Sequence, residues 1–133
     1  MAELSTYMED RIVNFMRNVA ITGEAAVYVA LFTADDGLEG GTITSEVPNS
    51  YDYARQLAGL SASSDGVSAN AGDITFGPAN GGAWGTVTHL ALIDSGTHAA
   101  GNVIMHSALD ASKTVADGDT FKINTGELDV TIA

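Results

Sequence analysis

The chain has 133 residues, with 17 acidic against 5 basic side chains, a formal net charge of −12 and no cysteine. The charge excludes attraction to nucleic-acid phosphates and anionic lipid surfaces, and the missing cysteines exclude disulfides, thiolate metal sites and a cysteine nucleophile. The length predicts one domain, or one domain with a short arm, and the hydrophobic fraction of 45% is too high for a disordered acidic tail.

No segment is typical of a targeting or membrane sequence. Glu3, Glu9 and Asp10 stand where a signal peptide would be basic. The longest apolar stretch, 25–32, is far shorter than the roughly 20 residues that cross a bilayer. We therefore expect a protein made in a cytoplasm, without a membrane partner.

Residues 4–20 are predicted to form an amphipathic helix. One face carries the apolar residues at helical spacing, namely Met8, Ile12, Phe15, Met16 and Val19. Thr6 with Glu9 three residues later indicates a capping box, and Gly23 is a reasonable stop. The first 23 residues are therefore predicted to be a helical arm, and 24–133 a separate body.

The body has the period of about two that is typical of strands. Segment 26–33 is apolar on both alternations, which predicts a strand covered on both faces. In segment 86–94, Val87, His89, Ala91 and Ile93 should face one way. Shorter strands are predicted at 53–60, 67–70, 73–76, 102–108, 113–115, 119–123 and 127–132. Asp117-Gly118 predicts a two-residue hairpin between strands. The fold class is therefore mainly β, an antiparallel β-sandwich or jelly-roll-like domain preceded by one N-terminal amphipathic α-helix.

Motifs that carry chemistry are sparse. His89 and His106 lie on predicted strands and could meet across a sheet, but they lack the close spacing of a metal motif. Asp35-Asp36 and 117–119 (DGD) could ligate Ca²⁺, although neither fits the EF-hand loop, and bound Ca²⁺ is left open. The serines and threonines match no nucleophile motif. We therefore predict no enzyme activity and no catalytic, cofactor-binding or metal residues.

Charge is distributed unevenly along the chain. Residues 1–23 hold three acids and two bases, a balance of −1, whereas residues 24–133 hold 14 acids and three bases, a balance of −11. The near-neutral helix can pack on its own body or on a neighbouring subunit or partner, and both interpretations stay open. The candidate contact residues, each of which can equally be core, are Tyr7, Met8, Phe15, Met16, Tyr51, Tyr53 and Trp84.

Several segments, taken in order, cover nearly the whole chain. They are 27–33 (VYVALFT), 53–56 (YARQ), 71–76 (AGDITF), 84–89 (WGTVTH), 113–115 (KTV) and 118–119 (GD). Together with the N-terminal helix they resemble a family of small tailed-phage virion proteins, described as tail fibre-like or virion structural. The resemblance implies a non-enzymatic protein located in the virion.

The role within the virion has three alternatives. The chain lacks a repetitive shaft, which favours a capsid decoration (cement) protein at the capsid surface. In this role it is predicted to bridge major capsid protein subunits as a homo-oligomer, namely a trimer. The first alternative is a tail fibre-like or tail adaptor subunit. The second is a carbohydrate- or cell-surface-binding module, in which Trp84 and the tyrosines would stack on sugars.

Overall fold

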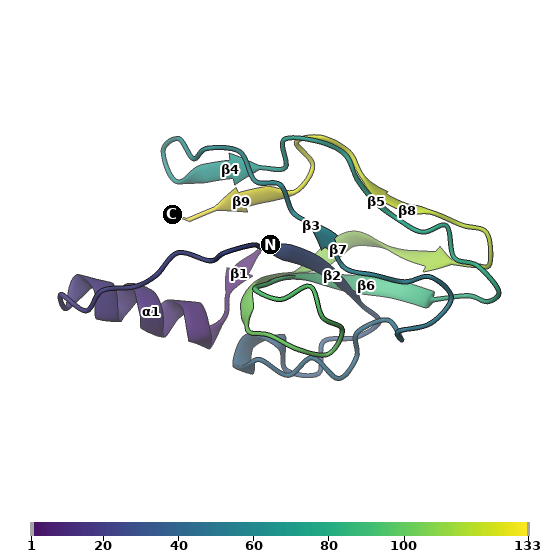
Figure 1. Ribbon diagram of the computed structural model, residues 1–133, viewed down its shortest axis with the longest axis horizontal. Helices are drawn as coiled ribbons and strands as arrows, with labels where there is room; N and C mark the ends of the chain where they lie inside the picture. Colours follow the sequence, from purple (N-terminus) through teal and green to yellow (C-terminus); the bar gives the residue numbers. More distant parts are fainter. Residues whose placement is uncertain (1, 133) are drawn as a thin grey trace.

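The structure is a computed structural model that describes residues 2–132, and it is mainly β, with antiparallel strands and one N-terminal α-helix, as the sequence predicts. The elements are β1 Glu3–Leu4, α1 Thr6–Met16, β2 Tyr28–Phe32, the 3₁₀ helix η1 Leu38–Gly40, β3 Gln56–Leu57, β4 Val67–Ala69, β5 Ile74–Phe76, β6 Gly85–Ile93, β7 Val103–Val115, β8 Phe121–Ile123 and β9 Asp129–Thr131. A five-stranded sheet has the order β1-β7-β6-β2-β3, and β4–β9 and β5–β8 form two-stranded ladders. Figure 1 shows the ladders in a layer above the sheet, with α1 projecting to one side.

The main core lies between the five-stranded sheet and the two ladders, and a second, smaller core covers the other face of the sheet. Strand β2 shows why both cores form. Val29 and Leu31 enter the main core, whereas Ala30 and Phe32 alternate into the second core beside Leu38 of η1. The prediction that this strand is covered on both faces is confirmed.

Strand β6 departs from a simple alternation. Its pairing with β7 shifts between Val87 and His89, which is a β-bulge. The bulge changes the phase of the side chains, so Val87 lies in the main core while Ala91 and Ile93 lie in the second. The prediction that Val87, His89, Ala91 and Ile93 share one face is therefore wrong for Val87.

The helix is shorter than the predicted 4–20, and its N-cap lies one residue before the predicted cap. Ser5 is the N-cap: its hydroxyl oxygen accepts from the Met8 amide at 3.3 Å and its O–H donates to the Val103 carbonyl. Thr6 is the first helical residue. The predicted capping box on Thr6 is wrong because the buried Ser5 hydroxyl finds a partner on β7 as well as on the helix.

The strands differ from the prediction in three further places. The predicted strands 102–108 and 113–115 form one continuous strand, β7, and the predicted strand 53–60 is reduced to β3. Asp117-Gly118 does make a turn, in which the Asp119 amide donates to the Ala116 carbonyl at 2.9 Å. The predicted hairpin is nevertheless wrong, since the turn carries the chain from the sheet to a ladder, where β8 pairs with β5.

Candidate functional site

The arm is anchored at its root by backbone pairing. Strand β1 adds to the edge of β7, with Glu3 opposite His106 and Leu4 opposite Met105. Ser5 then fixes the start of α1 against β7 through the two bonds described above. The direction in which the helix leaves the body is therefore set by β1 and Ser5, and α1 projects beyond the sheet (Figure 1).

The far end of the arm exposes apolar side chains. None of the residues of α1 is buried, and Phe15 and Met16 are 61% and 79% exposed. We call the exposed apolar residues at this end the arm tip, and they are Val13, Phe15, Met16, Val19 and Ile21. Apolar side chains gathered at one exposed place, unlike single ones scattered over a surface, mark a site of association.

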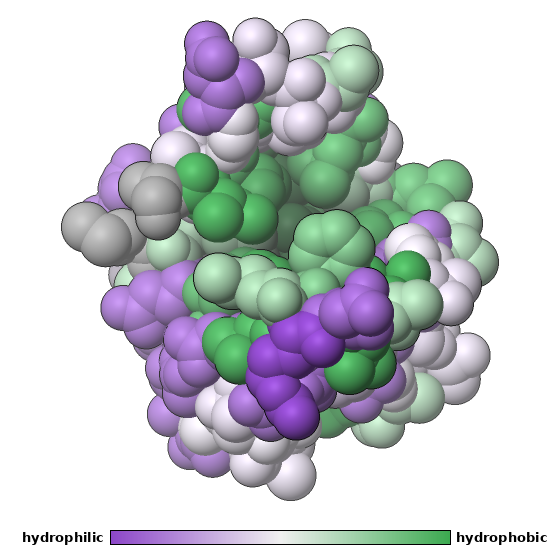
Figure 2. All heavy atoms as spheres, turned by 90° about the vertical axis from the view of Figure 1, so that its left-hand side faces the viewer, coloured by the Kyte–Doolittle hydropathy of each residue, from purple (hydrophilic) through white to green (hydrophobic). Residues whose placement is uncertain are grey.

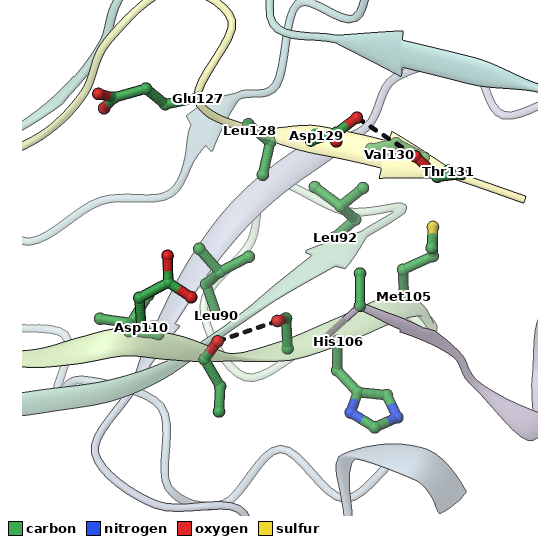
Figure 3. Close-up of a pocket in the computed structure, with 14 residues that line it drawn as sticks. Leu90, Leu92, Met105, His106, Asp110, Glu127, Leu128, Asp129, Val130 and Thr131 are labelled. Atoms are coloured by element: carbon green, nitrogen blue, oxygen red, sulfur yellow. Dashed lines mark hydrogen bonds between the residues drawn. The ribbon is translucent and has the colours of Figure 1, made fainter.

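A cleft of about 660 Å³ opens between the sheet and β9. Leu90 and Leu92 of β6 and Met105 of β7 line one side, and Leu128 and Val130 line the other. Figure 3 shows Leu90 and Leu92 pointing toward Leu128 across the open space. Figure 2 shows apolar side chains gathered in a hollow on the side of the molecule from which α1 projects.

The cleft has an acidic rim and no contribution from α1. Asp110, Glu127 and Asp129 are exposed at its edge, and of residues 2–16 only Ala2 lines it. Within residues 2–132, none of these three carboxylates forms an ion pair with a basic side chain. The cleft therefore combines an apolar interior with an edge that favours a cation.

The arm tip carries such a cation. Four of the five basic side chains have a carboxylate or aromatic partner: Arg11 with Glu24, Arg55 with Glu46, Lys122 with Asp73, and Lys113 over the Phe121 ring. Arg17 is the fifth, and it donates to the Asn14 side chain at 2.9 Å. In the described part of the chain, Arg17 has no carboxylate partner, and it lies next to Met16 of the arm tip.

A buried ion pair lies elsewhere, within the body. Arg55 donates through Nε and Nη2 to the Glu46 carboxylate at 2.8 and 2.6 Å, and both side chains are almost fully buried. Burial opposes ionisation of Glu46, but hydrogen bonds from Arg55, the Tyr53 hydroxyl and the Ala99 amide outweigh it and hold the pKa of Glu46 below its ordinary value. Burial, followed by the nearby Glu46 charge, raises the pKa of Tyr53.

The buried pair joins two loops. Arg55 also donates through Nη1 to the carbonyls of Ser95 and Ala100 at 2.7 Å each. Because no residue of this network lines the cleft, the pair organises the body and does not present a reactive group to a ligand. Its signal in the sequence was a single arginine inside a segment otherwise poor in charge.

The predicted histidine pair does not meet directly. His89 lies opposite Ala108 and its Nδ1 contacts the Thr88 hydroxyl at 2.8 Å, whereas His106 lies opposite Ala91. The group that can offer ligand atoms to a metal is Glu3, Glu39 and His106, whose ligand atoms lie within 4.8 Å of one another. His106 Nε2 is already 3.0 Å from Glu39.

Of the four carboxylates considered for Ca²⁺, three accept from backbone amides and the fourth, Asp36, accepts from the Ser45 hydroxyl. Asp35 accepts from the Gly37 and Leu38 amides at 3.0 and 2.9 Å, and these bonds lower its pKa. Asp117 accepts from the Gly81 amide, and Asp119 accepts from the Ala116 amide, each at 3.0 Å. These are the bonds expected of turn residues.

The predicted contact residues fall into three groups. Tyr53 and Trp84 lie in the main core, where their rings meet edge to face at 5.4 Å. Tyr51 is exposed, and its carbonyl accepts from the Trp84 indole at 3.0 Å. The others lie on the helix, Tyr7 and Met8 half-buried at the root, and Phe15 and Met16 exposed at the arm tip.

Of the seven candidate contact residues, only Phe15 and Met16 therefore belong to the arm tip. That any of the seven contacts a partner stays a prediction. The cleft itself was missed. In the sequence, Leu90, Leu92 and Leu128 have the pattern of ordinary core positions in predicted strands. No sequence pattern indicates that a gap lies between β9 and the sheet at these residues.

Comparison with known proteins gives one family. The family model described as Podophage GP4 fiber I protein gp80 matches residues 3–131. The match therefore includes the arm, the sheet, both ladders and the acidic rim of the cleft. No curated protein matches the chain. In residues 2–132, no helix is long and apolar enough to cross a membrane.

Proposed function

The chain belongs to the Podophage GP4 fiber I protein gp80 family, a family of phage virion structural proteins, and from this membership we propose that it is a fibre component of a podophage virion. The match over 3–131 carries this proposal. It supports the fibre-like role, which the sequence alone placed second to capsid decoration. In this role the protein acts by assembly and not by catalysis.

The arm is the proposed assembly element. The described part of the arm, residues 2–23, leaves the body from a fixed root, and residues 24–132 form the unit that the arm connects to a neighbouring chain of the virion. Burying the arm tip removes exposed apolar surface from water, which favours the contact. The acidic body then faces solvent, where its charge keeps particles apart.

Capsid decoration remains a second candidate because the body is a compact two-layer unit with short strands and turns (Figure 1). In that role the arm would contact the major capsid protein, and three copies would meet on a three-fold axis. The carbohydrate-binding alternative has less support, since Tyr53 and Trp84, two aromatic side chains that would stack on a sugar, are buried.

Copy number and position in purified virions test the proposal. Quantitative mass spectrometry against the major capsid protein should give a few to a few tens of copies, and electron cryomicroscopy should place the density at the fibres. A copy number close to that of the major capsid protein would establish decoration and contradict the fibre role. Absence from purified virions would contradict both.

A second experiment isolates the arm. Phe15→Glu places a charge on the arm tip while leaving the core intact, because Phe15 is 61% exposed. We expect the variant to fold normally but to enter virions poorly. Leu57→Glu is the matched control, since Leu57 is 59% exposed on the edge strand β3, away from the arm. Equal incorporation of both variants would contradict an assembly role for the arm tip.

A further inference from the structure

We propose that the cleft between the sheet and β9 receives the arm tip of a second copy of this chain. The inference rests on the proposed role of the arm in assembly and names what the arm binds. Each subunit would give its arm tip to one neighbour and offer its cleft to a neighbour. Such an exchange gives a closed homo-oligomer when repeating the rotation from one copy to the next leads back to the first copy.

The two surfaces are complementary in polarity. The arm tip is apolar, and the cleft presents Leu90, Leu92 and Leu128 around a space of about 660 Å³. Leu92 and Leu128 are already almost fully buried in the main core, so the apolar surface that the cleft still exposes comes from half-buried side chains such as Leu90 and Val130. Filling the space with Phe15 and Met16 would remove this surface and the exposed arm tip from water in one step.

The two surfaces are also complementary in charge. Arg17 lies between Met16 and Val19 of the arm tip and has no carboxylate partner among residues 2–132. Asp110, Glu127 and Asp129 lie at the rim of the cleft and have no basic partner among the same residues. The protein has only five basic side chains against 17 acidic ones, and one of the five, Arg17, lies at the arm tip. An arginine at the rim of an apolar contact orients the partners and selects the correct register.

The arm tip cannot serve its own cleft while the root is in place. Strand β1 is paired with β7, and Ser5 bonds to both Val103 and the first turn of α1. The 11 residues of α1 then carry the arm tip about 16 Å from that anchor. Turning it back would break the β1 pairing and the helix cap, whereas a second copy can present its arm tip without either loss.

The first test measures the mass of the purified full chain in solution by light scattering. Wild type should have a multiple of the chain mass of 13.6 kDa. Phe15→Glu should raise the dissociation constant at least about tenfold, as removal of a central apolar anchor does. Leu57→Glu, equally exposed but outside both surfaces, should leave the mass unchanged. A wild-type chain that stays monomeric at about 100 μM would overturn the inference.

The second test uses the absence of native cysteine. Met16→Cys and Val130→Cys chains, mixed under mild oxidation, should form a disulfide between the two species. Mixing Met16→Cys with Leu57→Cys is the matched control and should give little of the mixed product. If the doubly substituted chain, Met16→Cys with Val130→Cys, closes a disulfide within one molecule instead, the arm tip occupies its own cleft and the inference is overturned.

The third test exchanges the charges. Arg17→Glu should weaken association roughly fivefold, the scale of an exposed ion pair, and adding Asp129→Arg in the same chain should restore most of the loss. Both positions are exposed, so neither change should unfold the body. Failure of Asp129→Arg to rescue Arg17→Glu, with both chains folded, would contradict this pairing.

These outcomes separate the inference from the proposed function. A chain that is monomeric in solution, yet needs Phe15 to enter virions, would assign the arm tip to another virion protein and leave the fibre role standing. A chain that exchanges arm tips in solution but is absent from virions would support the inference and contradict the fibre role.

Discussion

At the scale of single residues, the body depends on one buried charge pair. Arg55 belongs to the segment 53–56 (YARQ), one of the segments that carry the family resemblance. In the structure the arginine neutralises Glu46 and also donates to the carbonyls of Ser95 and Ala100. One side chain thus connects the loop that precedes β3 to the loop that joins β6 and β7.

Arg55→Met should therefore destabilise the protein strongly. Removing one partner leaves a buried, unpaired carboxylate and two carbonyls without their donor, a change that costs about 3–5 kcal/mol of unfolding free energy. Urea unfolding measured by circular dichroism checks the value. Arg17→Met is the control, because Arg17 is exposed and its loss should change stability by less than about 0.5 kcal/mol. Similar midpoints for both variants would contradict the structural role of Arg55.

The same pair predicts a loss of stability in acid. The pKa of Glu46 in the folded protein lies below its ordinary value of 4.5, so the unfolded chain binds the proton more readily. Its contribution is fully present above the unfolded pKa and is lost as the pH falls through the folded pKa. Glu46→Gln should therefore be less stable near neutral pH, yet show a shallower decline in melting temperature below about pH 4.5. Parallel curves for the two proteins would show that another carboxylate controls the acid limb.

At the scale of elements, the connection between arm and body depends on Ser5. Ser5→Ala removes the cap of α1 and the donor to the Val103 carbonyl, at an expected cost of about 1–3 kcal/mol. Hydrogen exchange at the Met8 amide should quicken in this variant. Thr6→Ala is the control that separates the observed cap from the predicted one. If Thr6→Ala has the larger effect, the cap lies at Thr6 and the assignment to Ser5 is wrong.

What could be predicted from the sequence at this scale depended on local patterns. Strand β2 was recognised because both of its alternations are apolar, a property that needs no knowledge of its neighbours. The bulge in β6 was not, because it arises from pairing with β7. The Ser5 cap was missed for a similar reason: its hydroxyl is satisfied by Val103, which is 98 residues away in sequence.

The candidate site was also predictable only in part: the contact residues at the arm tip follow from a local pattern, and the cleft does not. Phe15 and Met16 were predicted as contact residues because helical spacing placed them on an apolar face, whereas the cleft arises from the spacing between β9 and the sheet. Leu128 and Leu90 approach it from distant parts of the chain, and neither carries a local mark of exposure. The partner of Arg55 was likewise out of reach, since nothing local couples it to Glu46.

At the scale of the whole molecule, charge and apolar surface are arranged in opposition. The body carries most of the net charge of −12, and the arm tip presents apolar side chains at the end of a nearly neutral segment. Copies that approach one another must overcome a long-range repulsion before any apolar contact forms. The strength of association should therefore depend on ionic strength in a direction that reveals which force dominates.

Raising the salt concentration should strengthen self-association. An increase from about 10 mM to about 150 mM shortens the Debye length from about 30 Å to about 8 Å, which screens the repulsion between acidic bodies more than a close contact at Arg17. Sedimentation velocity at both concentrations should show the dissociation constant falling several-fold. Arg17→Gln should show a still larger fall, because it lacks the one attraction that salt weakens. If wild-type association instead weakens with salt, the arginine contact, and not the apolar arm tip, holds the copies together.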